Sequence, residues 1–277
     1  MTRTETDWGV ALFRKSVLKQ AKFRRILELL DDPAGKVNLD IGADNGVISY
    51  LLRQRGGQWS SADLDQRAVA SIRQLVKTDV YQLDGARLPF GDRSVDQVVV
   101  VDYLEHIHED GTFARELERV LKAGGCVIIN VPHLQPRSPL NRLRHRIGLT
   151  DAWHGHVRPG YTLASLRAVL GPRFHVERAV TYSRFGSELV DTALNGIYEA
   201  MQRRKGVAGS SKGTVVTRDD VDRNRKQFRL LSALYPALRL TAAADALLPW
   251  QAGHKLIVRA RLDPGDSSHN AGLSPMA

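Results

Sequence analysis

The chain has little cysteine, no long apolar run and few aromatic residues. Its 277 residues include one cysteine, Cys126, which excludes an internal disulfide framework and a cysteine-rich metal site. No apolar run reaches the roughly 20 residues that a helix needs to span a bilayer. The first residues lack the apolar core of a signal peptide. We therefore expect a cytoplasmic protein.

Acidic residues are also in short supply. Lys and Arg total 40 against 30 Asp and Glu, which gives a net charge of +10 at pH 7. This charge favours acidic partners, such as nucleic acid, an anionic membrane surface or a phosphorylated substrate. A basic surface without a specific partner explains it equally well. Aromatic residues make up only 6% of the chain, which argues against a protein that stacks on nucleic-acid bases.

What is present is typical of a globular protein. Apolar residues make up 43% of the chain and charged residues 25%, and the length suits one sizeable domain with insertions. We predict a basic amphipathic helix in residues 1–34, a domain in 35–262 and a disordered tail in 263–277. The basic helix, expected over 8–30, leaves open a peripheral contact with the inner face of an anionic membrane.

The segment 37–52 changes its hydrophobic period at two glycines. Apolar residues alternate over 37–41, as in a strand, and recur at helical spacing over 47–52. Gly42 and Gly46 lie between the two patterns. Because Gly42 has no Cβ, the backbone can turn sharply there and a ligand can approach it. The pattern predicts the first strand–turn–helix unit of an open α/β sheet, in which a nucleotide-like ligand binds at the strand's carboxyl end.

Two acidic residues indicate which nucleotide this unit binds. Asp63 follows Gly42 by 21 positions, and an acid about 20 residues past such a turn can bind both hydroxyls of a ribose. Asp44 lies in the turn itself, beside Asn45, and its charge would repel a diphosphate. S-adenosylmethionine carries no phosphate. The turn therefore fits this cofactor better than NAD.

Strands and helices alternate from the turn to about residue 133. Strands that alternate with helices predict a parallel sheet with right-handed crossovers. A continuous apolar run over 95–101 is typical of a strand covered on both faces. Residues 122–125 are expected to cap a helix. The predicted strands are 37–41, 59–65, 80–83, 95–101, 127–131, 174–181 and 254–260, and two of the predicted helices are 66–76 and 162–170.

Two segments depart from the alternation and are expected on the substrate side. Residues 134–160 follow a strand's carboxyl end, so this insertion should lie over the ligand crevice. Its arginines at 142–146 are candidates for binding an acidic group, or form a solvated face. The second insertion is 187–250, in which 203–218 is expected to be a linker or a mobile lid and 228–250 to cover the pocket or join the core.

Four stretches of this sequence, in this order, resemble the class I S-adenosylmethionine-dependent methyltransferases, in particular the branch with small-molecule and lipid acceptors. They are Leu39-Asp40-Ile41-Gly42, Leu83-Asp84-Gly85-Ala86 with Leu88-Pro89-Phe90, Leu104-Glu105-His106, and Arg119 to Gly125. The resemblance implies a Rossmann-like, mostly parallel seven-stranded sheet with helices on both faces, with a C-terminal helical insertion.

The resemblance also implies the cofactor, S-adenosylmethionine, and the residues that bind it. Asp40 and Gly42 would line its methionine end, with Asp102 nearby. Asp63 would bind the ribose, Leu64 and Gly85 would lie against the adenine, and Asp84 would accept from its amino group. The complete set of expected cofactor residues is Asp40, Gly42, Ala43, Asp44, Gly46, Asp63, Leu64, Asp84, Gly85 and Asp102. The family usually has small residues where Asp44 and Asn45 stand.

Histidines are the candidates for a general base, because imidazole titrates near neutrality. His106, His133 and His156 follow strand ends or lie in the first insertion, and we take them as catalytic candidates. For His106 the favoured interpretation is structural, as a residue of the turn that packs the start of the next helix, whereas for His154 and His156 a base or substrate role and a plain loop role are equally favoured. His154 and His156 form a His-x-His pair, but the sequence offers no evident third ligand, so we expect no metal. Tyr161 and Tyr182 are candidates for lining the acceptor pocket or for the core.

The sequence thus favours transfer of a methyl group to a small-molecule or lipid-like acceptor of acidic character. Two alternatives stay open. One is an RNA or protein methyltransferase, although the chain lacks the Asn-Pro-Pro-aromatic motif of enzymes that methylate amino groups. The other is a non-catalytic module that binds the cofactor, because a fold alone does not establish chemistry.

Overall fold

A computed structural model describes residues 5–43, 45–204, 235–236, 239–241, 243, 245–247 and 251–264. Asp44, the predicted tail beyond 264, nearly all of the predicted linker and most of the segment 228–250 lie outside the described residues. Among the helices that the structure describes, none is both long and apolar enough to cross a bilayer.

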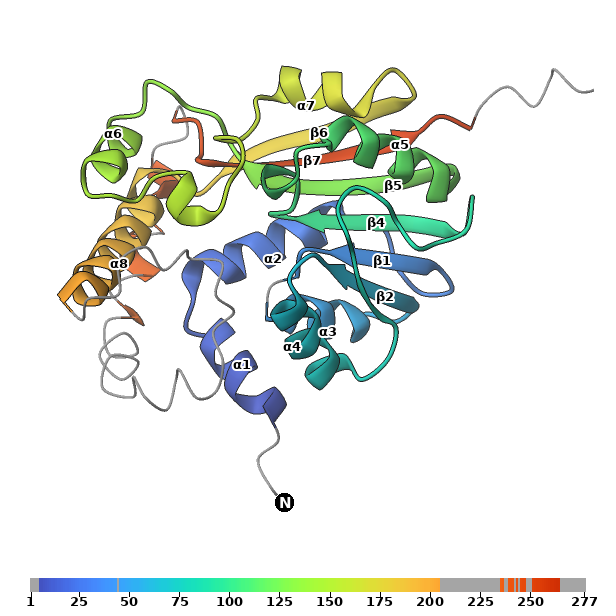
Figure 1. Ribbon diagram of the computed structural model, residues 1–277, viewed down its shortest axis with the longest axis horizontal. Helices are drawn as coiled ribbons and strands as arrows, with labels where there is room; N and C mark the ends of the chain where they lie inside the picture. Colours follow the sequence, from blue (N-terminus) through green and yellow to red (C-terminus); the bar gives the residue numbers. More distant parts are fainter. Residues whose placement is uncertain are drawn as a thin grey trace, which may run out of the picture.

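A single sheet organises the described chain, and it confirms the predicted mostly parallel seven-stranded fold (Figure 1). The strand order is β3-β2-β1-β4-β5-β7-β6, and all neighbours are parallel except β7, which runs antiparallel to β5 and β6. The strands are β1 (Val37–Ile41), β2 (Gln58–Asp63), β3 (Val80–Gln82), β4 (Val95–Val101), β5 (Leu121–Pro132), β6 (Phe174–Tyr182) and β7 (Lys255–Leu262).

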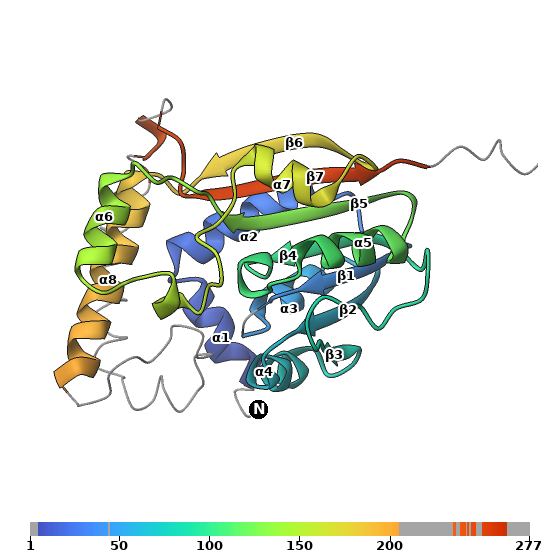
Figure 2. The same ribbon diagram turned by 45° about the horizontal axis from the view of Figure 1, so that its top comes forward.

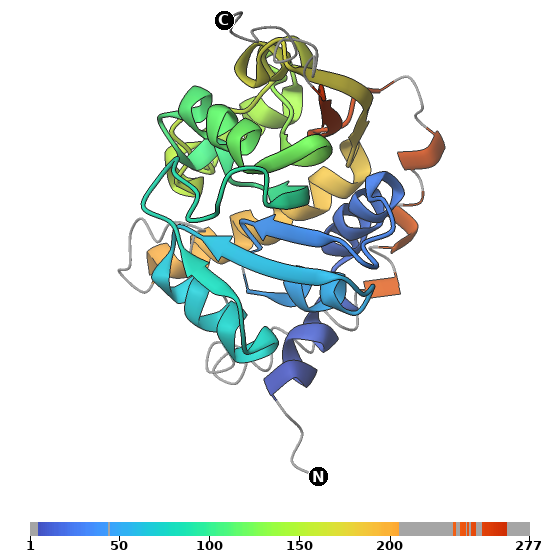
Figure 3. The same cartoon turned by 90° about the vertical axis from the view of Figure 1, so that its right-hand side faces the viewer.

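Helices cover both faces of this sheet because its inner strands carry apolar side chains on both sides. Val98 and Val100 pack on the face of α5 and α7, whereas Val99 and Val101 pack on the face of α2 and α3. Figure 3 shows α2 and α5 on opposite sides of the strands. The α-helices are α1 (Glu5–Phe13), α2 (Val17–Leu29), α3 (Val47–Arg53), α4 (Gln66–Val76), α5 (Asp110–Val120), α6 (Pro139–Arg146), α7 (Leu163–Leu170) and α8 (Phe185–Arg204).

The predicted single N-terminal helix is wrong in one respect, because it is two helices. Helix α1 ends at Phe13 and α2 begins after Ser16, whose Oγ accepts a hydrogen bond from the amide of Lys19 at 3.3 Å. A serine that caps the amides of a following turn favours a new helix start over continuation. Gln20 secures the bend, since its amide donates to the carbonyls of Phe13 and Arg14.

The segment 122–125 also differs from the prediction of a helix cap. It belongs to β5, which already pairs with β4 at Leu121 and Val95. The pairing shifts register between Val95 and Gln97, and Gly124 has a φ of +72°. The two glycines therefore accommodate a bulge inside a strand, which local sequence patterns do not distinguish from a turn.

The first insertion packs against α8 beyond the carboxyl ends of the strands (Figure 2). Helix α6 begins at a Ser138 cap with Pro139 in its first turn, and it runs beside α8. Arg144 joins the two helices, because its guanidinium bonds Thr192 Oγ1 at 2.8 Å and Glu188 Oε2 at 2.5 Å. The arginine is therefore a link between helices and not a free cation for a substrate.

Candidate functional site

A cavity of about 1160 Å³ lies at the carboxyl ends of β1, β2, β4 and β5, between the sheet and the first insertion. Parallel strands bring the loops that follow them to one edge of the sheet, which is where open α/β sheets bind their ligands. Residues from the strand ends line one side of the cavity, and residues from α1, α2, α6 and α8 line the other. We call this cavity the cleft.

One end of the cleft contains the predicted cofactor residues that follow β1 and β2. Gly42, Ala43, Asp63 and Leu64 line it. The φ of Gly42 is +80°, and a Cβ there would lie 2.1 Å from the carbonyl oxygen of Val101, so only glycine fits this turn. Asp63 is 9% exposed, and its Oδ1 accepts from the amide of Asp65 at 3.1 Å.

Asp40 lies behind this end of the cleft and does not line it. Its side chain is fully buried, and its carboxylate accepts from Ser49 Oγ at 2.5 Å and Ser61 Oγ at 2.8 Å, with Arg53 at 3.6 Å. Burial outweighs these partners and raises the pKa of Asp40 to about 6. Asp40 therefore links β1 to α3 through Ser49 and to β2 through Ser61.

Three further cofactor candidates also lie outside the lining of the cleft. Gly46 caps α3 with a φ of +81°, and a Cβ there would lie 2.7 Å from Ile72 Cα, so it permits close packing of α3 on α4. Asp84 is exposed in the loop after β3. The carbonyl of Gly85 accepts a hydrogen bond from Tyr103 Oη at 2.6 Å, which ties this loop to the end of β4.

Asp102 lines the middle of the cleft in a left-handed conformation, with a φ of +45°. It accepts from Lys22 of α2 and from Asn130 Nδ2 of β5 at 2.8 Å, and Lys255 Nζ of β7 lies 3.8 Å away. Burial raises the pKa of Asp102, but the two ammonium groups outweigh it and hold the pKa well below the usual range. Asp102 thus stays ionised and connects three elements at the cleft.

Beyond Asp102, the cleft contains a group of ionisable side chains drawn from two distant segments. Glu105 and His106 belong to a short helix after β4, η1 (Leu104–His106), and His154 and His156 come from the first insertion. The rings of His106 and His156 have centroids 5.0 Å apart, and those of His154 and His156 are stacked at 5.2 Å. The structure therefore brings together two of the three catalytic candidates.

Glu105 is buried at the centre of this group. Its side chain is 1% exposed, and neither carboxylate oxygen has a hydrogen-bond partner among the described residues. Burial, with the charge of Asp102 nearby, raises the pKa of Glu105 to about 8. Sequence reasoning missed this residue as a functional candidate, although the acid next to His106 at a strand's end was a signal for it.

His133, the third catalytic candidate, lines a different part of the cleft. Its Nδ1 lies 2.8 Å from the carbonyl oxygen of Gly253, and Gln135 donates to the same oxygen. Tyr182 also lines the cleft and donates to Asn130 Oδ1 at 2.6 Å. Tyr161 is in the core instead, where its hydroxyl donates to Asp110 at 2.9 Å.

Comparison with known proteins places the matching part of the chain around this cleft. Residues 39–129 match a family model described as a methyltransferase domain. A Mycobacterium tuberculosis (strain ATCC 25618 / H37Rv) protein named "Probable S-adenosylmethionine-dependent methyltransferase" is 33% identical over 102 residues, which cover 36% of this chain and 37% of that protein.

Two relatives carry names that mention a quinone. The "Ubiquinone biosynthesis O-methyltransferase" of Pseudomonas aeruginosa (strain LESB58) is 30% identical over 113 residues, covering 39% of this chain and 49% of that protein. The "Demethylmenaquinone methyltransferase" of Tropheryma whipplei (strain Twist) is 29% identical over 118 residues, covering 41% and 49%. The chain spans less than half the length of these curated relatives.

Solved structures extend the likeness in fold to most of the chain. An S-adenosylmethionine-dependent methyltransferase from Mesorhizobium loti has a TM-score of 0.55 and 14% identity, covering 87% of this chain and 97% of that one. The [4+2]-cyclase SpnF has a TM-score of 0.56 and 18% identity, covering 89% and 82%. Because one of the two is named as a cyclase, this likeness establishes the fold alone. The reaction has to be argued from the residues of the site.

Proposed function

We propose that the chain, in which residues 39–129 match a methyltransferase domain, is a class I S-adenosylmethionine-dependent methyltransferase that methylates an oxygen of a small-molecule or lipid-like acceptor. The observation that supports the proposal is that one cleft is lined both by residues suited to binding the cofactor and by histidines suited to removing a proton. Asp63 and Leu64 line it at the end of β2, and His106 and His156 line it beyond β4.

The side chains at the end of the cleft near β1 and β2 match the chemical groups of S-adenosylmethionine. Asp63 presents a carboxylate for the two ribose hydroxyls, and Leu64 and Ala68 supply apolar surface for the adenine. Gly42 lets the backbone come close to the ligand. When bound, S-adenosylmethionine supplies a methyl group already activated on its sulfonium. The protein therefore has mainly to align the donor and the acceptor.

The acceptor end offers groups that can remove a proton. The imidazole of His106 or His156 can take the proton of an acceptor hydroxyl. Arg142 and Arg146 also line the cleft and are exposed, so they would attract an acidic group on the acceptor. The names of the two quinone-related relatives support a small organic acceptor.

We further propose that the two insertions select the acceptor. Helices α6 and α8 contribute Asn141, Arg142, Glu188 and Asn195 to the wall of the cleft. They lie opposite the strand ends, where a substrate would have to approach the cofactor. The domain core would then bind the cofactor, and the insertions would determine what is methylated.

Replacement of Asp63 tests the cofactor half of the proposal. In Asp63→Asn, two charge-assisted hydrogen bonds to the ribose become neutral, at a loss of about 1 kcal/mol each. The affinity for S-adenosylmethionine, measured by isothermal titration calorimetry, should fall by about 30-fold. Glu109→Gln is the matched control, because it removes one exposed carboxylate that does not line the cleft. Equal affinity in the two variants would contradict the assignment of Asp63.

Transfer of a labelled methyl group tests the acceptor half. The full chain is incubated with S-adenosylmethionine carrying a tritiated methyl group and a cell extract, which is then divided into organic-soluble, protein and RNA fractions. Label in the organic-soluble fraction supports the proposal. Label confined to RNA or protein establishes one of the alternatives, and no label in any fraction, despite cofactor binding, leaves a non-catalytic module.

A further inference from the structure

Glu105 is a buried acid whose carboxyl group has no hydrogen-bond partner among the described residues. It is 1% exposed, and both of its carboxylate oxygens lack a partner among the described residues. The two nearby lysines, Lys22 and Lys255, direct their ammonium groups toward Asp102. Because a buried polar group without a partner is costly, its retention at the wall of a cleft points to a ligand.

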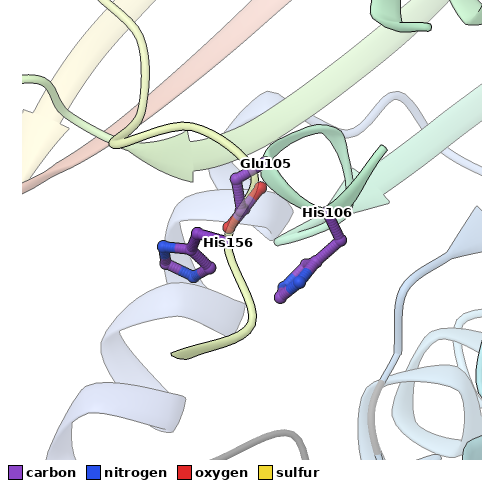
Figure 4. Close-up of side chains that lie close together, drawn as sticks. All are labelled: Glu105, His106 and His156. Atoms are coloured by element: carbon purple, nitrogen blue, oxygen red, sulfur yellow. The ribbon is translucent and has the colours of Figure 1, made fainter. Parts of the chain in front are cut away.

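Two imidazoles lie around this carboxylate, as Figure 4 shows. One nitrogen of His106, one nitrogen of His156 and one oxygen of Glu105 all lie within 4.8 Å of one another. A metal ion with bonds of about 2.0–2.2 Å holds tetrahedral ligand atoms about 3.3 Å apart. The three side chains therefore reach a common cation by closing in by about 1.5 Å.

The ring of His106 is held in the orientation of a metal ligand. Its Nδ1 lies 3.0 Å from the carbonyl oxygen of Gly155, and since a carbonyl only accepts, Nδ1 carries the proton. The lone pair is then on Nε2. Metal-binding histidines usually donate their second ring nitrogen to a carbonyl or carboxylate in this way. The ring of His156 is oriented in turn by its stack on His154, at an interplanar angle of 23°.

Backbone hydrogen bonds hold the two contributing segments together. The amide of Val157 donates to the carbonyl of Glu105 at 2.8 Å. Arg158 donates to the carbonyls of Ile107 and His108 at 2.9 Å each and pairs with Asp110. The segments that carry Glu105 and His156 are therefore joined next to the proposed ligands, so the site is built into the fold.

We propose that Glu105, His106 and His156 bind a divalent transition-metal cation such as Zn²⁺. Two imidazole nitrogens and one carboxylate suit zinc and its neighbours, whereas Mg²⁺ and Ca²⁺ prefer oxygen ligands alone. Three protein ligands leave a coordination position open to the cleft, as in catalytic zinc sites. An acceptor hydroxyl would bind there, and the cation would lower the pKa of that hydroxyl so that its proton leaves to solvent, in place of proton removal by His106 or His156. This last step rests on the proposed methyl transfer, whereas cation binding does not.

The test measures Zn²⁺ binding by the full chain without cofactor or acceptor. After treatment with EDTA and its removal, the protein competes for ZnCl₂ with a chromogenic chelator. We expect one Zn²⁺ per chain, and an affinity at least tenfold lower in Glu105→Gln and in His156→Gln. His175→Gln is the matched control, because His175 is an exposed histidine on β6 that does not line the cleft. Replacement of Zn²⁺ by Co²⁺ should produce visible absorption that His156→Gln loses.

The outcomes separate this inference from the proposed function. Thermal unfolding of the cation-free variants checks that each one folds, and His106→Gln replaces any variant that does not. The inference is overturned if the parent binds no stoichiometric Zn²⁺, or if His156→Gln binds it as tightly as His175→Gln. S-adenosylmethionine binding is measured separately on the same samples, so a failure of the cofactor assignment is recognised independently.

Discussion

Asp102 should stabilise the fold through its charge, and Asp102→Asn isolates that charge. Asparagine tolerates the left-handed backbone at this position, where φ is +45°. Its amide oxygen can still accept from Asn130, as the carboxylate does at 2.8 Å. What the variant removes is the shared counter-ion of Lys22 and Lys255, whose side chains are 18% and 30% exposed.

The expected loss follows from this geometry. Removal of one partner from a buried ion pair costs about 3–5 kcal/mol, and we place Asp102→Asn at about 2–4 kcal/mol because both lysines reach solvent in part. Lys22→Met should cost less, about 1–2 kcal/mol, since Asp102 keeps Asn130 and Lys255 as partners. The free energy of unfolding is measured in urea by far-ultraviolet circular dichroism.

The pH dependence gives a second check on the same residue. The pKa of Asp102 lies below its usual range in the folded state, so its contribution is complete above about pH 4, the unfolded value, and is lost as the pH falls further. The difference in free energy of unfolding between the parent and Asp102→Asn should therefore narrow as the pH falls below about 4. The reasoning would be refuted if Asp102→Asn lowered the free energy of unfolding by less than about 1 kcal/mol at neutral pH, or if Lys22→Met lowered it more than Asp102→Asn does.

Two other side chains give predictions of the same kind. Arg119 donates to the carbonyls of Leu88 and Phe90 at 2.9 and 2.8 Å and pairs with Glu116, so Arg119→Ala should lose about 2–3 kcal/mol in urea unfolding. Arg119→Lys should recover less than half of this, because an ammonium lacks the fork geometry; full recovery would contradict that account. The pKa of Asp40 rises on folding from 3.8 to about 6, so the folded state binds the proton more tightly and loses stability as the pH rises through this window. Relative to Asp40→Asn, the free energy of unfolding of the parent in urea should fall by about 2.5 kcal/mol between pH 4 and pH 7, and parallel curves would count against a raised pKa.

Much of the fold followed from local patterns in the sequence. Helix α4 and strand β4 have the predicted bounds, because the periodicity of apolar residues along each segment is set by its own burial. The break at Ser16 and the bulge at Gly124 were missed, since a cap and a bulge depend on contacts outside the segment.

The candidate site was less accessible to sequence reasoning. Gly42 and Asp63 both line the cleft, because they lie at the carboxyl ends of the parallel strands β1 and β2, and their part in binding the cofactor stays a prediction. The third ligand beside His156 could not be found by spacing, since Glu105 reaches it only through the folded contact of two distant segments. The expected absence of a metal rested on that missing ligand. Arg144 looked available for a substrate, but α8 supplies its partners.

The position of β7 has a consequence for synthesis on the ribosome. This strand lies inside the sheet, paired with β5 from Cys126 to Pro132 and with β6 from Phe174 to Tyr182. Until Leu262 has left the exit tunnel, β5 and β6 have no common partner, and each presents an unpaired edge. The nascent chain is therefore most exposed to aggregation between the emergence of β6 and that of β7, after the parallel half of the sheet has been made.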